Sequence, residues 1–179
     1  MRPSIGGRAA ETEVTSPPVR IGVVSDTHNH VANVQEIVAL FNRAGVERVV
    51  HTGDITQAKT LDVFAGLEAP LHGVFGNNDL ERKSLDAAIS RYGFQFQEPP
   101  LRLEWAERRL VVVHDPRDLE RRRADEHDVS LHGHTHLHLC EREAGRLVFN
   151  PGECAGHMQG FNAVGVVDLE DLAVEILRF

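Results

Sequence analysis

The stretch VRIGVVSDTHNHVANVQEIVALFNRAGVERVVHTGD, residues 19–54, decides the fold class of this chain. Residues 19–26 predict a short buried strand, and residues 31–45 place apolar side chains at helical spacing before a stop at Gly45. Residues 46–54 repeat the pattern of the first strand. The order strand, helix, strand favours a parallel sheet, and ligands of such sheets bind beyond the carboxyl ends of the strands.

The alternation of strands and helices continues to about residue 91 and then changes. Residues 60–67 predict a short helix, 71–79 a third strand and 81–91 another helix. Closely spaced segments of strand character follow at 94–97, 101–105, 109–114, 129–133, 137–143, 146–150, 163–169 and 173–179. Hairpin connections are expected at 143–146 and 169–172. We expect these later segments to form a second, more antiparallel sheet.

Length and composition limit the class of protein. A chain of 179 residues with 41% hydrophobic residues suits one domain, expected over residues 19–179. Residues 1–18 lack the apolar run of a secretory signal and predict a mobile tail, and no later run is long enough to span a membrane. Cys140 and Cys154 are too few for a disulfide framework, which favours a cytoplasmic location.

The charge of the chain bears on its partners. A formal net charge of −8 argues against broad binding to nucleic-acid backbones, whereas a small phosphorylated substrate held by metal is compatible with it. One basic run opposes this average and contains Arg117, Arg121, Arg122 and Arg123. We interpret it as a solvated helical turn whose charges pair with Glu120 and Asp125.

The segment SLHGHTHLHL, residues 130–139, carries histidine at every second position. The four are His132, His134, His136 and His138. Side chains two apart on a strand point to one face, so the set is either a solvated strand face or a group of ligands. Gly133 interrupts the run and indicates a bend, which predicts a strand ending near His132 and then a shaped loop.

Polar residues collect where five of the predicted strands end. The blocks are SDTHNH, HTGDI, FGNNDL, VVVHDP and LHGHTH. Each block alone is typical of an ordinary turn. Together they supply the aspartate, asparagine and histidine donors that divalent transition metals accept, which indicates a metal site.

In order, these blocks resemble the motifs D-x-H, G-D, G-N, H and G-H-x-H of the calcineurin-like metallophosphoesterase superfamily. The spacing is most similar to its small bacterial and archaeal phosphodiesterase branch, to which the retromer subunit Vps29 is related. The resemblance covers about residues 19–179. It implies an α/β fold, a four-layer αββα sandwich of two mixed β-sheets flanked by helices, with two metal ions at one edge.

The resemblance also implies the metal ligands. Asp26, His28 and His136 would bind the first metal. Asn77, His114 and His134 would bind the second, and Asp54 would bridge the two. Asp54, Asn77 and His134 are the implied catalytic residues. The implied cofactors are two divalent transition metal ions, with manganese preferred and iron, nickel, cobalt or zinc compatible with the same donors. For His132 and His138 we favour a structural or exposed strand position.

The chemistry is consistent with this set of residues. Two metals about 3.5 to 4 Å apart clamp a phosphate and lower the pKa of a shared water, which gives a hydroxide for in-line attack. A carboxylate such as Asp54 is a natural bridge because its negative charge offsets the repulsion of the cations. Gly53, Gly76 and Gly133 would let the backbone pass close to the metals. His30 and His51 are either groups behind the ligands or local structure.

Three positions depart from patterns in the superfamily. Asn78 stands where phosphatases have a histidine that protonates the leaving group, and a neutral amide cannot act as an acid. Asp79, beside it, would orient a ligating histidine or cap a helix. Asp115 and Glu153 add acid near the expected mouth of the site, so an extended polyanion should be disfavoured unless Arg117 compensates.

These observations favour a metal-dependent phosphodiesterase that hydrolyses a small phosphodiester, with cyclic nucleotides among the candidate substrates. One alternative is a Vps29-like protein-interaction scaffold with little or no catalysis. Another is a phosphomonoesterase, which Asn78 weakens. A homodimer through an edge strand is a further expectation.

Overall fold

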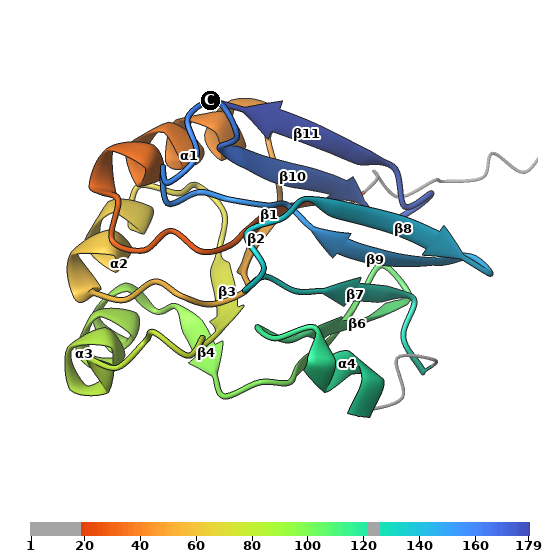
Figure 1. Cartoon of the computed structure of the whole chain (residues 1–179), viewed down its shortest axis with the longest axis horizontal. Coiled ribbons are helices and arrows are strands. Elements are labelled where there is room, and N and C mark those ends of the chain that lie inside the picture. Colours follow the sequence, from red (N-terminus) through yellow and green to blue (C-terminus); the bar gives the residue numbers. More distant parts are fainter. Residues whose placement is uncertain (1–18, 122–125) are drawn as a thin grey trace, which may run out of the picture.

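The structure is a computed structural model that describes residues 19–121 and 126–179, and this part of the chain contains four helices and eleven strands. The tail predicted at residues 1–18 lies outside the described residues. Figure 1 shows the helices α1, α2 and α3 together along one side of the molecule. No helix in the described part is long and apolar enough to cross a membrane.

The first sheet has six strands in the order β11-β10-β1-β2-β3-β4. Their bounds are β1 (Arg20–Val24), β2 (Arg48–His51), β3 (Leu71–Val74), β4 (Gln95–Gln97), β10 (Ala163–Asp168) and β11 (Val174–Arg178). Strands β1 to β4 are parallel, whereas β10 is antiparallel to both of its neighbours. The parallel arrangement predicted from residues 19–54 is therefore confirmed, and it brings the carboxyl ends of β1, β2 and β3 to one edge.

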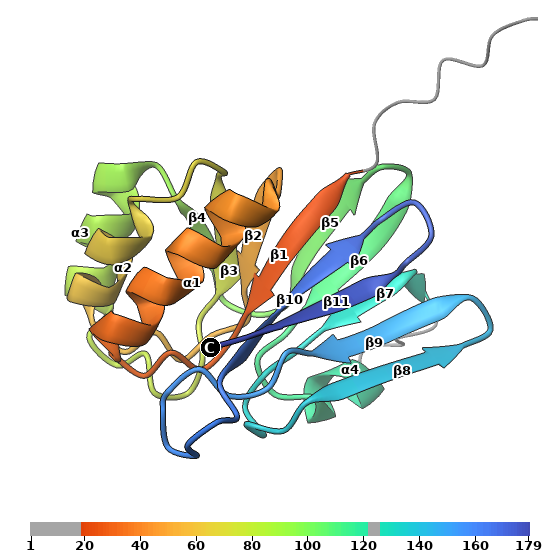
Figure 2. The same cartoon turned by 90° about the horizontal axis from the view of Figure 1, so that it is seen from above.

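Three helices cover the outer face of this sheet, as Figure 2 shows from above. They are α1 (Val31–Ala44), α2 (Ala58–Phe64) and α3 (Arg82–Tyr92). Helix α1 begins at His30, whose ring accepts a hydrogen bond from the backbone N–H of Asn33, and ends at Gly45 in the left-handed conformation. Its apolar face buries Val34 and Phe41 against the sheet.

The second sheet has five strands in the order β5-β6-β7-β9-β8. Their bounds are β5 (Leu101–Trp105), β6 (Arg108–Val112), β7 (Val129–Leu131), β8 (Leu139–Glu143) and β9 (Arg146–Asn150). The inner pairs are parallel and the outer pairs antiparallel. The short helix α4 (Arg117–Arg121) packs Leu119 on the outer face of this sheet, against Val111 and Val148. The four-layer αββα sandwich of two mixed sheets is confirmed, with one short helix as its fourth layer.

The assignment of all later strands to the second sheet was wrong for β4, β10 and β11, which belong to the first. Strand β4 follows α3, and a helical crossover returns the chain parallel to the preceding strand. Strand β10 has five buried residues in succession, as an interior strand requires, and it pairs with β1. Close spacing along the chain therefore did not identify the sheet that each strand joins.

An apolar layer fills the space between the two sheets. Ile21, Val50 and Val74 of the first sheet pack in one cluster with Leu131 and Phe149 of the second. All five side chains are fully buried. This layer fixes the two sheets face to face, so the loops after β6 and β7 lie beside those after β1, β2 and β3.

Candidate metal centre

The loops at this edge bring together seven side chains from five segments. Asp26 and His28 follow β1, Asp54 follows β2, Asn77 follows β3, His114 follows β6, and His134 and His136 follow β7. These are the residues that the resemblance implied as metal ligands. The contacts among them divide into two clusters, here called the first and the second cluster.

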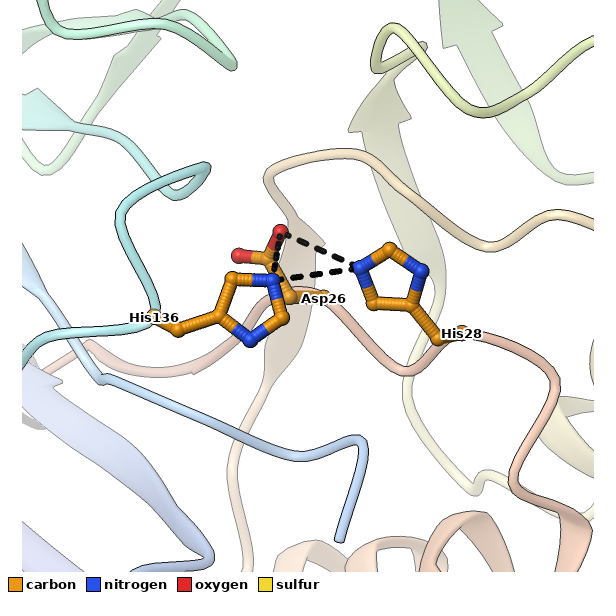
Figure 3. Close-up of side chains that lie close together, drawn as sticks. All are labelled: Asp26, His28 and His136. Carbon is orange, nitrogen blue, oxygen red and sulfur yellow. Dashed lines mark hydrogen bonds and ion pairs between the residues drawn. The ribbon is translucent and has the colours of Figure 1, made fainter. Parts of the chain in front are cut away.

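The first cluster consists of Asp26, His28 and His136, shown in Figure 3. The Nε2 atoms of the two histidines are 3.2 Å apart, and they lie 3.8 Å (His28) and 3.5 Å (His136) from Oδ1 of Asp26. Asp26 is fully buried, and its Oδ1 has no hydrogen-bond partner among the described residues. Burial alone would raise the pKa of Asp26, but the neighbouring His28 ring and the hydrogen bond from Ser25 to Oδ2 outweigh it and lower the pKa. A buried anionic oxygen thus faces two imidazole nitrogens.

The second cluster consists of Asn77, His114 and His134. The Oδ1 atom of Asn77 lies 2.9 Å from Nε2 of His114 and 2.9 Å from Nδ1 of His134. The other nitrogen of the His114 ring, Nδ1, lies 2.9 Å from the carbonyl oxygen of Thr52. Because a carbonyl only accepts, this contact assigns a proton to Nδ1, and Nε2 is the ring nitrogen that faces the cluster.

Asp54 lies between the two clusters. Its Oδ2 atom is 3.4 Å from Nε2 of His28 and 3.5 Å from Nε2 of His114. Asn78 donates its backbone N–H to Oδ1 at 2.9 Å and its side-chain amide to Oδ2 at 2.7 Å. Burial would raise the pKa of Asp54, but His114 and Asn78 lower it well below the usual range. The carboxylate is therefore ionised and held from both sides.

Asp79 was expected either to orient a ligating histidine or to cap a helix, and the structure gives it a different role. Its carboxylate accepts from the backbone N–H groups of Asp54, Ile55, Thr56 and Gly76, at 2.6 to 3.0 Å. The residue at the N-terminus of α3 is Glu81. Asp79 is buried, and it organises the turn that carries Asp54.

Strained backbone conformations are frequent among the candidate ligands. Five of the seven side chains come from residues with positive φ, namely Asp26, His28, Asp54, His134 and His136. Non-glycine residues rarely adopt this conformation, and in folded proteins such strain collects at functional sites. The shaped loop predicted after His132 accounts for two of these residues.

Close backbone approach explains two of the glycines in the motifs. A methyl group at Gly133 would lie 1.9 Å from Oγ of Ser25 and 2.7 Å from Oδ2 of Asp26. A methyl group at Gly76 would lie 2.2 Å from Oδ1 of Asp54. Any larger residue would push these carboxylates out of place.

Two further groups beside the first cluster were missed as candidates. A carboxylate oxygen of Glu153 and ring nitrogens of His136 and His157 all lie within 4.8 Å of one another. The His157 ring stacks on His136 with centroids 5.6 Å apart. Glu153 is 1% exposed and accepts from the backbone N–H groups of His157 and Met158. From the sequence, Glu153 was considered only as a negative charge near the mouth of the site. His157 lies in an irregular segment, so it could not be placed from the end of a predicted strand.

Three further histidines, His51, His132 and His138, have local roles. Gly53 donates its N–H to Nδ1 of His51 at 3.1 Å, and Nε2 of His51 lies 3.1 Å from the Thr27 hydroxyl. Full burial lowers the pKa of His51 to about 3, so the ring is neutral. His132 is 3% exposed, and His138 packs its ring against Phe149 on the surface. The structural interpretation favoured for His132 and His138 agrees with these positions.

The acid added at Asp115 is compensated. Nε of Arg117 lies 3.0 and 2.9 Å from the two carboxylate oxygens of Asp115, and this pairing lowers the pKa of Asp115 to about 2. The pairing predicted for this run with Glu120 and Asp125 falls on side chains outside the described residues. Because Glu153 is buried and Asp115 is paired with a cation, neither supplies the unpaired surface charge that the sequence suggested.

Comparisons with known proteins agree with this geometry. Residues 19–172 match the family described as calcineurin-like phosphoesterase superfamily domain. A phosphodiesterase of Methanocaldococcus jannaschii is 31% identical over 156 residues, which are 85% of this chain and 94% of that protein. The solved structure of an archaeal phosphodiesterase has a TM-score of 0.82 at 29% identity and covers 89% of this chain and 99% of its own.

The chain belongs to the calcineurin-like phosphoesterase superfamily. Its relatives are those of the small phosphodiesterase branch that the motifs resemble. Vacuolar protein sorting 29 from Cryptosporidium parvum shares the fold, with a TM-score of 0.57 at 17% identity over 90% of this chain and 97% of its own. The phosphodiesterase hypothesis and the scaffold hypothesis therefore predict the same fold, and only the side chains of the site can distinguish between them.

Proposed function

We propose that residues 19–179 form a metal-dependent phosphodiesterase that hydrolyses a small phosphodiester. The observation that carries this proposal is the position of Asp54, whose Oδ2 is 3.4 Å from His28 and 3.5 Å from His114. A single carboxylate oxygen between two sets of histidine donors is the arrangement that two bridged cations require. The matching archaeal phosphodiesterase supports the same reaction class.

The side chains fit two divalent transition metal ions. Asp26, His28 and His136 would hold one ion, Asn77, His114 and His134 the other, and Asp54 would contact both. The unpartnered buried Oδ1 of Asp26 supports this fit, because an ionised oxygen without a donor is costly unless a cation occupies the site. When bound, the ions would activate water as a nucleophile and neutralise charge on the phosphate. We propose manganese as the first choice, since mixed nitrogen and oxygen sites accept several metals and availability decides among them.

The chain's own residues limit which esters are hydrolysed. Asn78 uses its side-chain amide to hold Oδ2 of Asp54, and an amide has no proton to give to a leaving group. Asp54, Asn77 and His134 remain the residues proposed to act on the substrate. Diesters with a good leaving group should therefore react faster than monoesters that need an acid.

Hydrolysis of bis(p-nitrophenyl) phosphate and of p-nitrophenyl phosphate, with manganese and then with a chelator, tests the proposal. We expect diester turnover that is lost with chelator and in Asp54→Asn, together with two metal ions per chain in the wild type. Asp86→Asn, the same substitution at an exposed position of α3, serves as the matched control. Turnover that survives in Asp54→Asn would overturn the proposal.

A protein-interaction scaffold is the second candidate, because Vps29 structures share this fold. Two bound metals per chain without hydrolysis of any diester would favour it. The cytoplasmic location, the absence of broad nucleic-acid binding and a homodimer through an edge strand are proposals that rest on composition, charge and exposed sheet edges.

A further inference from the structure

A cavity of about 420 Å³ opens beside the first cluster. It is lined by the polar or charged side chains of His136, His138, Glu153 and Arg178, and by the apolar side chains of Leu137, Met158 and Phe161. Its volume lies in the range of small-molecule sites. An arm of the substrate that binds in this cavity would lie next to a phosphate held at the first cluster.

The apolar lining of this cavity is exposed to solvent. Leu137 is 63%, Met158 37% and Phe161 59% exposed. Among the described residues the only other large hydrophobic side chain this exposed is Leu80. Three of the four therefore gather around one cavity next to His136. Clustered exposed apolar residues indicate a binding surface, whereas scattered single ones do not.

A second cavity, of about 380 Å³, flanks the second cluster and has a different character. It is lined by Asn77, His114 and His134 of the second cluster and by the pair of Asp115 and Arg117, here called the charged wall. The two sides of the centre thus offer different surroundings to the two arms of a diester, one apolar and one charged.

We propose that the cavity beside His136 binds an aromatic, uncharged arm of the phosphodiester. This inference rests on the function proposed above and adds to it the class of substrate. Phe161 and Met158 would contact the face and edge of a ring, as aromatic and thioether groups do. Arg178 and the carboxyl group of Glu153 both line the cavity, so its lining combines groups of opposite charge and favours an uncharged arm. With a volume of about 420 Å³ and His136 in its lining, the cavity has room for a ring system beside a phosphate at the first cluster, which suits part of a small substrate better than a segment of a partner protein.

Calorimetric titration of the manganese-loaded protein with diphenyl phosphate and with diethyl phosphate tests this proposal. The two probes carry the same charge and differ only in their arms. We expect diphenyl phosphate to bind about tenfold more tightly, because burial of an apolar ring contributes on this scale. Phe161→Ala and Met158→Ala should remove most of this preference by lowering the affinity for diphenyl phosphate toward that for diethyl phosphate.

Leu80→Ala is the matched control, because Leu80 is 82% exposed and lies outside the cavity. The preference for diphenyl phosphate should persist in this variant. Equal affinities for the two probes, or an undiminished preference in both cavity variants, would overturn the proposal. Hydrolysis of bis(p-nitrophenyl) phosphate is measured separately, so a binding preference without turnover would contradict only the proposed reaction, and turnover without preference only the cavity.

Discussion

The two clusters differ in charge although each contains two histidines. The first includes the buried carboxylate of Asp26, whereas the second has the neutral amide of Asn77 in the corresponding place. Both are close to Oδ2 of Asp54. Since a divalent ion gains more from an anionic oxygen than from an amide oxygen, the first cluster should hold its ion more tightly. The two proposed metal sites would share one carboxylate and are therefore not expected to be symmetric.

The largest expected effect comes from removing this difference in charge. Asp26→Asn should reduce the metal content from two ions per chain to one or fewer and lower diester turnover by about a hundredfold or more, because loss of a direct ligand exceeds the effect of an outer partner. Metal content by mass spectrometry after desalting, together with turnover of bis(p-nitrophenyl) phosphate, checks both parts.

Asn77→Asp is the reciprocal variant. It adds an anionic oxygen to the second cluster without changing the size of the side chain. The two stepwise metal affinities, measured by titration, should be about tenfold or more apart in the wild type and closer together in Asn77→Asp. Two equal affinities in the wild type would contradict the asymmetry.

The sequence predicted those parts of the site that follow from strand ends. A parallel sheet brings the carboxyl ends of its strands to one edge, so Asp26, Asp54 and Asn77 had to lie near one another. His134 and His136 were identified through the resemblance of the block LHGHTH to the superfamily motif G-H-x-H, whereas Gly133 by itself predicted only a bend and a shaped loop after His132. In both cases a local pattern determines the position in space.

The groups that were missed or misassigned depend on contacts between distant segments. Asp79 faces four backbone amides, and a backbone amide is present at every residue, so no side-chain pattern identifies these partners. His157 lies next to His136 because of the course of an irregular loop, which has no helical or strand periodicity from which its course could be predicted. The place of β10 beside β1 follows from burial on both faces, a property of the assembled sheet.

Asp79→Asn should affect both clusters alike, unlike the change at Asp26. In the wild type, backbone N–H groups donate to the carboxylate of Asp79. The NH2 group of the asparagine cannot accept these hydrogen bonds, and their loss should lower the free energy of unfolding by about 1–3 kcal/mol. Denaturation in the presence of chelator measures this loss without the contribution of bound metal, and metal titration should show both affinities weakened. Asp86→Asn is again the control. Weakening of one affinity alone would mean that Asp79 supports a single cluster.

The smallest effect is expected at the charged wall beside the second cluster. Arg117→Gln leaves the carboxylate of Asp115 without its cation, and this carboxylate lines the same cavity as His134. Repulsion of an anionic diester should then raise KM by about two- to fivefold, with little change in kcat, because exposed charge pairs are weak. The increase should disappear at high salt, where such interactions are screened.

Arg91→Gln, at an exposed pair with Asp62 on α2, is the control. An unchanged KM at low salt would mean that Asp115 does not face the substrate, and the difference between the two sides would then rest on Asp26 and the apolar cavity.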